Sequence, residues 1–180
     1  APHTIGIPYF KGDRDSSTEI SKQLYDLGRL FENVSNMEVV AESFRLHAEQ
    51  EIGFRKATKK EYDTTTEDVL NDTLETCLTI ARREKHPAKE TKDNFKLLEK
   101  GIRSFGAGYL MEGHFRIENA MAASARVALM VVKIIKNDMS PIAYYEGEDI
   151  KDLNIEHPDY AYLNRLKRQP DKSIFYYWHQ

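Results

Sequence analysis

The most apolar stretch of the sequence is AMAASARVALMVVKII, residues 120–135. A helix that crosses a membrane needs about 20 consecutive apolar residues, and Arg126 and Lys133 interrupt this shorter run. Its first half is rich in alanine, a small residue that lets neighbouring helices approach closely. The stretch therefore predicts a buried central helix, inside a longer helix over residues 109–136, and no membrane segment.

Amphipathic segments precede this central helix along the chain. The capping-box pattern, in which Ser or Thr is followed three residues later by Glu, occurs at 16–19, 35–38 and 64–67. Apolar residues at helical spacing follow each box and recur after the proline at position 87. We therefore expect helices over about 17–33, 36–60, 64–86 and 88–103, followed by a hinge at Gly106 and Gly108.

The two ends of the chain differ from this helical part. Residues 1–15 contain Pro2, Gly6, Pro8 and Gly12, too many breakers for a helix. The chain of 180 residues has the length of one domain. The predicted fold class is all-α: a multi-helix domain at 16–138, with an extended N-terminal arm at 1–15 and an aromatic-rich C-terminal tail at 139–180.

The predicted tail is unusually aromatic for its length. It carries eight of the nineteen aromatic residues, which are Tyr144, Tyr145, Tyr160, Tyr162, Phe175, Tyr176, Tyr177 and Trp178. Since the tail has too few aliphatic residues for a core of its own, these rings must pack on the helical body or on another chain. Arginines near the aromatic residues favour another chain. Within the tail we expect a short helix over 160–168 and a short strand over 173–178.

Composition and motifs narrow the functional classes. The formal net charge is −3, which gives no electrostatic footprint for nucleic acid. A single cysteine, Cys77, cannot form an internal disulfide, so we expect a reducing, cytoplasmic location. No basic segment followed by an apolar run opens the sequence, so we expect no secretory signal. No P-loop, Gly-x-Ser-x-Gly or Gly-x-Gly-x-x-Gly motif is present, and no catalytic residue is predicted.

Two histidine–glutamate pairs suggest one chemical alternative. His47 and Glu51, and likewise His114 and Glu118, stand four residues apart, a spacing that places both side chains on one face of a helix. If the two helices faced each other, these four residues would form a metal site within the bundle. The Glu-x-x-His motif of ferritin-like di-iron sites is absent, however. A self-contained His/Glu metal-binding bundle therefore stays an alternative, and no metal is predicted.

The segment FRLHAEQEIGFRK, residues 44–56, also carries two Phe-Arg doublets. Phe44-Arg45 and Phe54-Arg55 each combine an apolar ring with a planar hydrogen-bonding fork, the pair that anchors many protein interfaces. The other interpretation is a helix that packs phenylalanine inward and leaves arginine in water. The candidate partner interface comprises these four residues together with Tyr144, Tyr145, Tyr160, Tyr162 and Trp178.

The doublets and the chain ends together resemble a known family. The resembling features are Ile5-Gly6-Ile7, Asp13-Arg14-Asp15, the two doublets followed by Tyr62-Asp63, the segment PIAYY at 141–145, residues 160–163, and Leu166-Lys167-Arg168. Over about residues 1–80 and 139–180, the sequence resembles the gamma subunit of the soluble methane monooxygenase hydroxylase. The doublets are spaced more widely and residues 101–136 are more apolar than in that family, which favours a divergent relative that oxidises methane or another alkane or alkene.

The resemblance implies a non-catalytic structural subunit that packs on alpha and beta subunits in a dimeric hetero-oligomer. The di-iron centre, oxygen activation and the substrate cavity would belong to the alpha chain, which leaves no cofactor on this chain. An accessory helical subunit of another large complex, such as a respiratory complex, would have the same sequence features. That alternative stays open.

Overall fold

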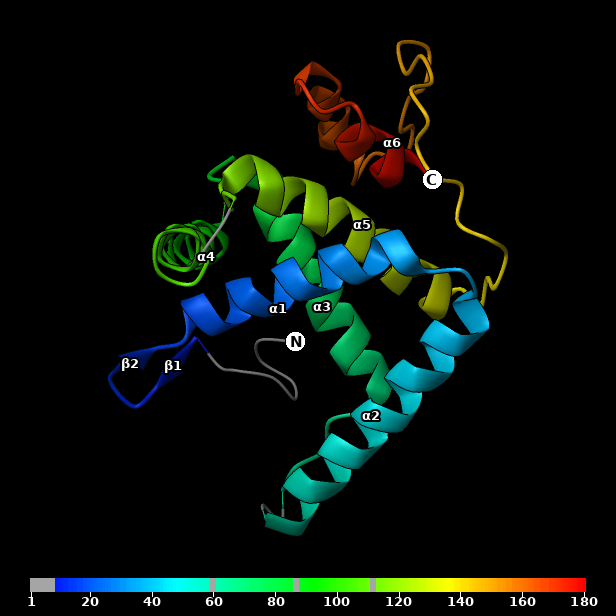
Figure 1. The fold of residues 1–180 in the computed structure, drawn as a ribbon. Coiled ribbons are helices and arrows are strands. Elements are labelled where there is room, and N and C mark those ends of the chain that lie inside the picture. Colours follow the sequence, from blue (N-terminus) through cyan, green and yellow to red (C-terminus); the bar gives the residue numbers. More distant parts are fainter. Residues whose placement is uncertain (1–8, 59–60, 86–87, 111–112) are drawn as a thin grey trace.

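The structure is a computed structural model that describes residues 9–58, 61–85, 88–110 and 113–180. It is an all-α protein, as the sequence predicted, and it also contains a small two-stranded hairpin that was not predicted. Figure 1 shows the arrangement of its elements. In chain order these are β1 (Phe10–Lys11), β2 (Arg14–Asp15), α1 (Ser17–Leu30), the 3₁₀ helix η1 (Phe31–Asn33), α2 (Met37–Thr58), α3 (Thr66–Arg82), α4 (Lys89–Gly108), α5 (Ile117–Ile135), the 3₁₀ helix η2 (Ala161–Arg168) and α6 (Ser173–His179).

Helix α5 lies at the centre of the fold, where α1, α3 and α6 pack on it. Ala120 and Ala125 are completely buried, and a Cβ at Gly28 of α1 would lie only 2.7 Å from the Cβ of Ala123. The alanine-rich side of α5 therefore allows the close crossing of α1, as its sequence predicted. No helix in the described segments is long and apolar enough to cross a membrane.

The boundary between α4 and α5 differs from the prediction. Gly106 and Gly108 do not form a hinge, because α4 continues through both, and α5 begins only at Ile117. A Cβ at Gly106 would lie 2.5 Å from the carbonyl oxygen of Phe115. Gly106 thus serves a close contact inside the helix, where the sequence had suggested a break.

The starts of α1, α2, α3 and α4 lie within two residues of those predicted, but side chains other than the predicted ones cap α1, α2 and α3. At α3 the capping box joins Thr65 and Asp68, one residue beyond the predicted pair. At α2 the side chain of Asn36 accepts a hydrogen bond from the backbone of Glu38 at 2.8 Å. At α1 Asp15 accepts one from the backbone of Ser17 at 2.8 Å. Asp and Asn side chains cap helices as well as Ser and Thr do. At α1 and α2 the neighbouring Asp15 and Asn36 therefore take the place of the predicted serines, and at α3 Thr65 takes the place of the adjacent threonine.

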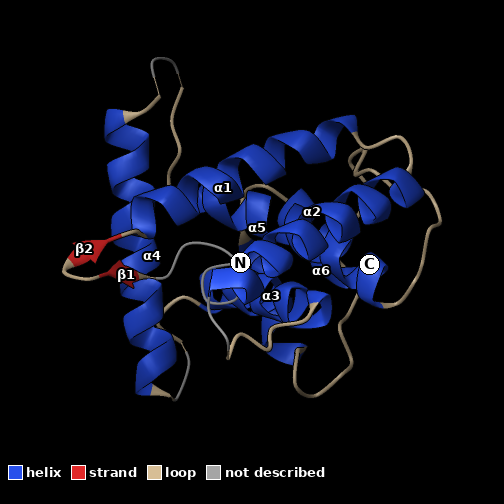
Figure 2. Cartoon of the chain, turned by 90° about the horizontal axis from the view of Figure 1, so that it is seen from below, coloured by secondary structure: helices blue, strands red, loops and turns tan. Residues whose placement is uncertain are grey.

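The C-terminal tail packs on the helical body. The predicted strand over 173–178 is wrong, because this segment is the helix α6, and the strands of the described chain lie only in the N-terminal hairpin (Figure 2). Asp171 accepts hydrogen bonds from the backbone and the hydroxyl of Ser173 at 3.0 and 2.6 Å, which starts the helix. Ile174 and Phe175 are then fully buried, in the same core as α5.

The N-terminal arm is described only from Tyr9 onward. Its described part is the hairpin of β1 and β2, in which Phe10 pairs with Asp15 and Lys11 with Arg14. Gly12 at the turn has φ +62°, a left-handed conformation that glycine adopts without strain. Residues 1–8 of the predicted arm lie outside the described residues.

Candidate docking surface

Helix α2 is the element that leaves the body of the molecule. It packs against α3 and α5 through a stripe that includes Met37, Phe44, Ala48 and Ile52. Its C-terminal half extends away from α1 and α5 (Figure 1). Over most of its length the opposite side of α2 is exposed. A helix with one packed face and a long free face is suited to receiving a partner.

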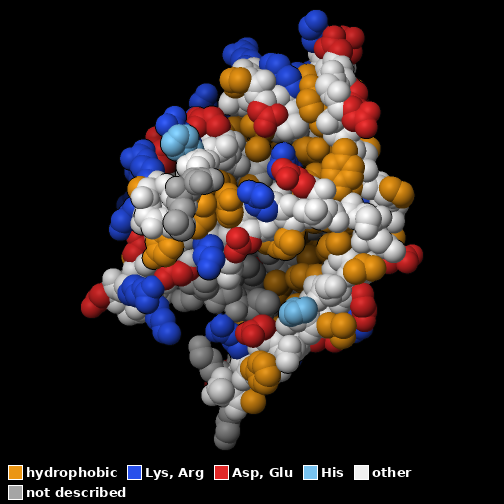
Figure 3. Space-filling view, viewed as in Figure 1, with side chains coloured by type: hydrophobic (Ala, Val, Ile, Leu, Met, Phe, Trp, Pro, Cys, Tyr) orange, Lys and Arg blue, Asp and Glu red, His pale blue; other side chains and the backbone are white. Residues whose placement is uncertain are grey.

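A cleft of about 390 Å³ lies between α2 and the body. Its apolar wall contains Phe44 from α2, Leu70 from α3, Ile134 from α5, and Met139. The acidic side chains Glu38 and Glu42, together with Arg45, line its α2 side. In the space-filling view, hydrophobic side chains lie beside and along α2, among acidic ones (Figure 3). The cleft therefore combines an apolar floor with a charged rim, as in the core and rim of protein interfaces.

The guanidinium of Arg45 is held in place at this rim. It donates to Glu42 at 2.7 and 3.0 Å and to Glu49 at 3.1 Å. These hydrogen bonds raise the pKa of Arg45, and the hydrogen bond from Arg45 lowers the pKa of Glu42. All three groups are exposed, so the network fixes the position of the fork more than it stabilises the fold.

The two Phe-Arg doublets have opposite orientations. Phe44 packs partly buried against the core, while Arg45 is exposed. In the second doublet Phe54 is 60% exposed, and Arg55 is half-buried. A ring in a pocket with a donor fork at its rim thus describes the first doublet only.

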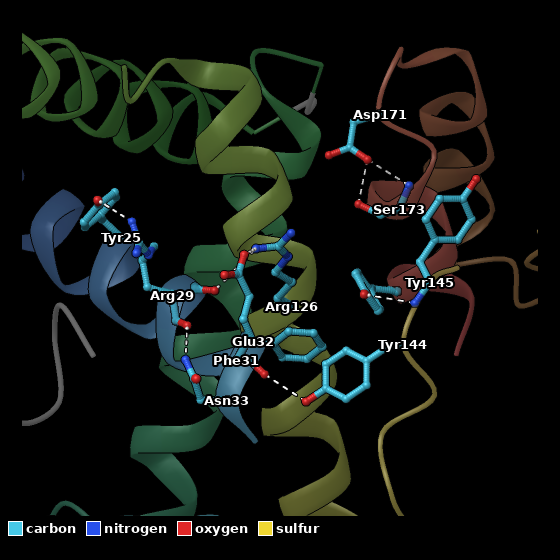
Figure 4. Close-up of polar contacts among 12 residues, drawn as sticks. Tyr25, Arg29, Phe31, Glu32, Asn33, Arg126, Tyr144, Tyr145, Asp171 and Ser173 are labelled. Carbon is cyan, nitrogen blue, oxygen red and sulfur yellow. Dashed lines mark hydrogen bonds and ion pairs between the residues drawn. The ribbon is translucent and has the colours of Figure 1, made fainter. Parts of the chain in front are cut away.

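The aromatic residues predicted for the interface mostly hold the tail on its own body. Tyr144 donates to the carbonyl oxygen of Phe31 (Figure 4) and to that of Val34. Tyr162 accepts from Nε of Arg82 at 2.8 Å. The remaining three differ in exposure. Tyr145 and Trp178 pack partly buried against the core, and Tyr160 is 39% exposed.

A further set of side-chain contacts lies where η1, which follows α1, meets α5. Arg126 of α5 donates to Glu32 at 2.9 Å, and its guanidinium carbon lies 6.0 Å from the ring centre of Phe31. Phe31 in turn meets the ring of Tyr144 edge-on at 5.5 Å. Figure 4 shows these side chains between the helices and the tail. The tail is thereby fixed next to the turn from which α2 starts.

The structure separates the residues of the alternative metal site. His47 and Glu51 lie exposed on α2, and Nδ1 of His47 is 2.8 Å from the carbonyl oxygen of Ser43. His114 precedes the start of α5, so His114 and Glu118 do not share a helix as expected. The described residues contain no group of three or more His, Cys, Asp or Glu side chains placed to hold a metal ion.

Sequence reasoning missed the exposed side of α2. Val39 is 61% exposed and Leu46 is 52% exposed, seven residues apart and on the same side as Phe54. We call this surface the outer stripe, which consists of Val39, Ser43, Leu46, Gln50, Gly53, Phe54 and Ala57. The seven-residue spacing of Val39 and Leu46 in the sequence could have indicated this apolar face, but the adjacent Phe-Arg doublets were the more prominent pattern.

Comparison of the sequence with protein families gave no match. Comparison with curated proteins gave no significant match. No solved structure matches the fold significantly.

Proposed function

We propose that this chain is the non-catalytic gamma subunit of a soluble di-iron hydrocarbon monooxygenase hydroxylase acting on methane or another alkane or alkene. Its role is to stabilise the alpha and beta subunits. The observation that carries the proposal is the cleft along α2, with Phe44 on its apolar wall and Arg45 at its rim. The sequence resemblance supplies the kind of assembly.

In this proposal the cleft receives an apolar segment of a larger subunit. Leu70, Ile134 and Met139 offer the apolar contact area, which gives most of the driving force for association. Arg45 is already oriented by two glutamates, so it loses little conformational freedom when it meets a carboxylate or carbonyl of the partner. Both features are typical of interface anchors.

The chemistry is assigned to the alpha chain, where the di-iron centre would activate oxygen. The residues of this chain contribute binding, and no catalytic step is assigned to them. A cytoplasmic location is part of the proposal. It is consistent with Cys77, a buried free thiol whose pKa is raised to about 12 by burial, which disfavours the reactive thiolate.

Co-expression with candidate alpha and beta subunits tests the proposal. The chain should assemble with them, and Ala41→Arg, which projects a charge into the cleft, should abolish assembly. Glu38→Arg at the same rim should weaken it. Ala107→Arg is the matched control, because Ala107 is an exposed alanine on α4, outside the cleft.

Circular dichroism of each variant checks that the fold is retained. Failure of the wild-type chain to assemble with any di-iron alpha and beta pair would contradict the proposed function. Assembly of both cleft variants at wild-type strength would remove the cleft as the contact site. Assembly with subunits of a respiratory or other complex would assign the chain to that complex instead.

A further inference from the structure

We infer that the outer stripe of α2 pairs, in antiparallel orientation, with the outer stripe of a second copy of this chain. The inference concerns the exposed side of α2, opposite its packed stripe, and one flank of this side shares Glu42 and Arg45 with the rim of the cleft. It holds whether or not the proposed function does. It rests on exposure, on the glycine in the stripe, and on the match of charges between two copies.

The stripe is an apolar and uncharged strip on the exposed side of a helix. Apart from Phe54, which adjoins Gly53, its residues recur three and four positions apart, which places them along one face. Val39, Leu46 and Phe54 are 61%, 52% and 60% exposed, and none of the seven stripe residues carries a charge. The solvent side of an amphipathic helix is normally polar and charged, so the packing of this chain alone does not explain the stripe.

Gly53 points to a closely approaching neighbour. A glycine inside a helix is less favourable than alanine, and a Cβ at Gly53 would meet no atom within 4 Å. The fold of the single chain therefore does not require glycine here. Ser43 and Ala57, on the same strip, are also small. Small residues let the backbone of a second helix come close.

The stripe is complementary to itself when the two copies of α2 are related by a two-fold axis that passes between them, level with the point midway between Leu46 and Gln50. In that arrangement Leu46 faces Gln50 of the second copy. Ser43 likewise faces Gly53 of the second copy, and Val39 faces its Ala57. Each pair occurs twice, as in any isologous interface.

The flanks of the stripe match in the same register. On one flank Glu42 faces Lys56 of the second copy. On the other flank His47 faces Glu51 of the second copy, an ion pair when the imidazole is protonated. A parallel arrangement would instead place each of these residues against the identical residue of the second copy. Glu42 would then face Glu42, and the repulsion between the two carboxylates would destabilise the pair.

One like-charged pair meets near the axis, and the structure shows how it is neutralised. Glu49 faces Glu49 of the second copy, and each accepts a hydrogen bond from Arg45 of its own helix at 3.1 Å. The helix dipole accounts for acidic residues near the start of α2 and basic ones near its end. It does not account for the exposed apolar side chains or for the glycine, which the dimer explains together with the charges.

Sedimentation equilibrium of the full chain tests the inference. The wild-type chain should show a reversible monomer–dimer equilibrium. Leu46→Glu should weaken dimerisation at least about tenfold, because it buries a charge at the contact. Gly53→Leu should weaken it similarly, although leucine favours the helix and adds apolar surface. An association driven only by exposed apolar area would instead be strengthened by Gly53→Leu.

A charge exchange tests the register. Glu42→Lys and Lys56→Glu should each weaken the dimer, and the double variant should restore it. Each variant changes only exposed side chains, so the fold should be retained, which circular dichroism checks. A double variant no stronger than the single variants would overturn the register.

Disulfide cross-linking tests the orientation. When Ser43→Cys protein is mixed with Gly53→Cys protein, the disulfide should join the two different variants. Cys77 is buried and does not interfere. Self-linked Ser43→Cys dimers would indicate a parallel pair and overturn the antiparallel inference. A chain that stays monomeric up to about 1 mM, a concentration that corresponds to negligible affinity, would overturn the dimer without affecting the Ala41→Arg test of subunit assembly.

Discussion

The hydroxyl oxygen of Tyr144 lies 2.6 Å from the carbonyl oxygen of Val34. It also lies 3.0 Å from the carbonyl oxygen of Phe31, so the single hydroxyl hydrogen is shared between two backbone acceptors at the end of η1. These acceptors lie in the turn that precedes α2. The tail therefore stabilises the base from which α2 extends, and it links the C-terminal residues to the candidate docking surface.

Removal of this hydroxyl should lower stability. We expect Tyr144→Phe to reduce the free energy of unfolding by about 1 kcal/mol, the usual contribution of a hydrogen bond. Denaturant unfolding measures the change. Tyr160→Phe is the control, because Tyr160 is about as exposed as Tyr144 but its hydroxyl makes no hydrogen bond among the described residues, so this variant should unfold as wild type. Equal stability of the two variants would show that the Tyr144 contacts contribute nothing.

The crossing of α1 and α4 should be intolerant of any side chain at Gly101. A Cβ there would lie 2.2 Å from the carbonyl oxygen of Ser17, so the two backbones would have to separate. We expect Gly101→Ala to reduce the free energy of unfolding by about 3 kcal/mol. Gly108→Ala in the same helix meets no atom within 4 Å and should be close to neutral. Thermal unfolding of both variants checks the contrast.

The ion pair of Lys133 and Asp138 should make stability depend on pH. Lys133 is buried and donates to Asp138 at 2.6 Å and to Ser140 at 2.8 Å. Its hydrogen bond lowers the pKa of Asp138. The carboxylate therefore stabilises the fold above about pH 4, the ordinary aspartate range, and this contribution is lost as the pH falls toward the lowered pKa.

Thermal unfolding at several pH values measures this dependence. Asp138→Asn should lower the melting temperature at pH 7, because a buried ammonium group loses its counter-charge. The difference from wild type should shrink as the pH is lowered below about 4. A difference that stays constant with pH would mean that the charge of Asp138 is not what stabilises this contact.

Arg165 should stabilise the end of α3. It donates to the carbonyl oxygens of Ala81 and Arg82 at 2.7 and 2.6 Å, in the last turn of α3, where carbonyl oxygens lack partners within the helix. The carbonyl oxygen of Arg82 also accepts from the backbone N–H of Lys85 at 3.2 Å. We expect Arg165→Ala to reduce the free energy of unfolding by about 2 kcal/mol, typical of charged hydrogen bonds. Arg168→Ala, at an exposed position of η2, should have little effect. Urea titration distinguishes the two variants.

The main elements of the fold could be predicted because apolar spacing reports burial directly. The run that contains Ala120 and Ala125 became the buried central helix. The segment around Ile174 and Phe175 was wrongly predicted as a strand, because a run of aromatic residues favours a strand locally. In the structure this segment is a helix, whose side chains are buried against α5. Gly106 was wrongly predicted as a hinge because local sequence does not show its close contact with the backbone of Phe115, which follows the end of α4.

The candidate surface was predicted only in part. Sequence spacing identified Phe44 and Arg45 but gave no means to distinguish them from Phe54 and Arg55, whose exposures are reversed. The direction in which a residue faces depends on where α3 and α5 pack on α2, which local patterns do not contain. Leu46 was overlooked because an exposed leucine has no signature until the packed face is known.

Native mass spectrometry of the tagged chain, purified from its own cells, tests the proposed role most directly. We expect it to be bound in a fixed ratio to two larger chains, one of which carries two Glu-x-x-His motifs and a di-iron centre. A chain recovered only as its own monomer or dimer, with no such subunit, would contradict the assignment to a di-iron hydroxylase.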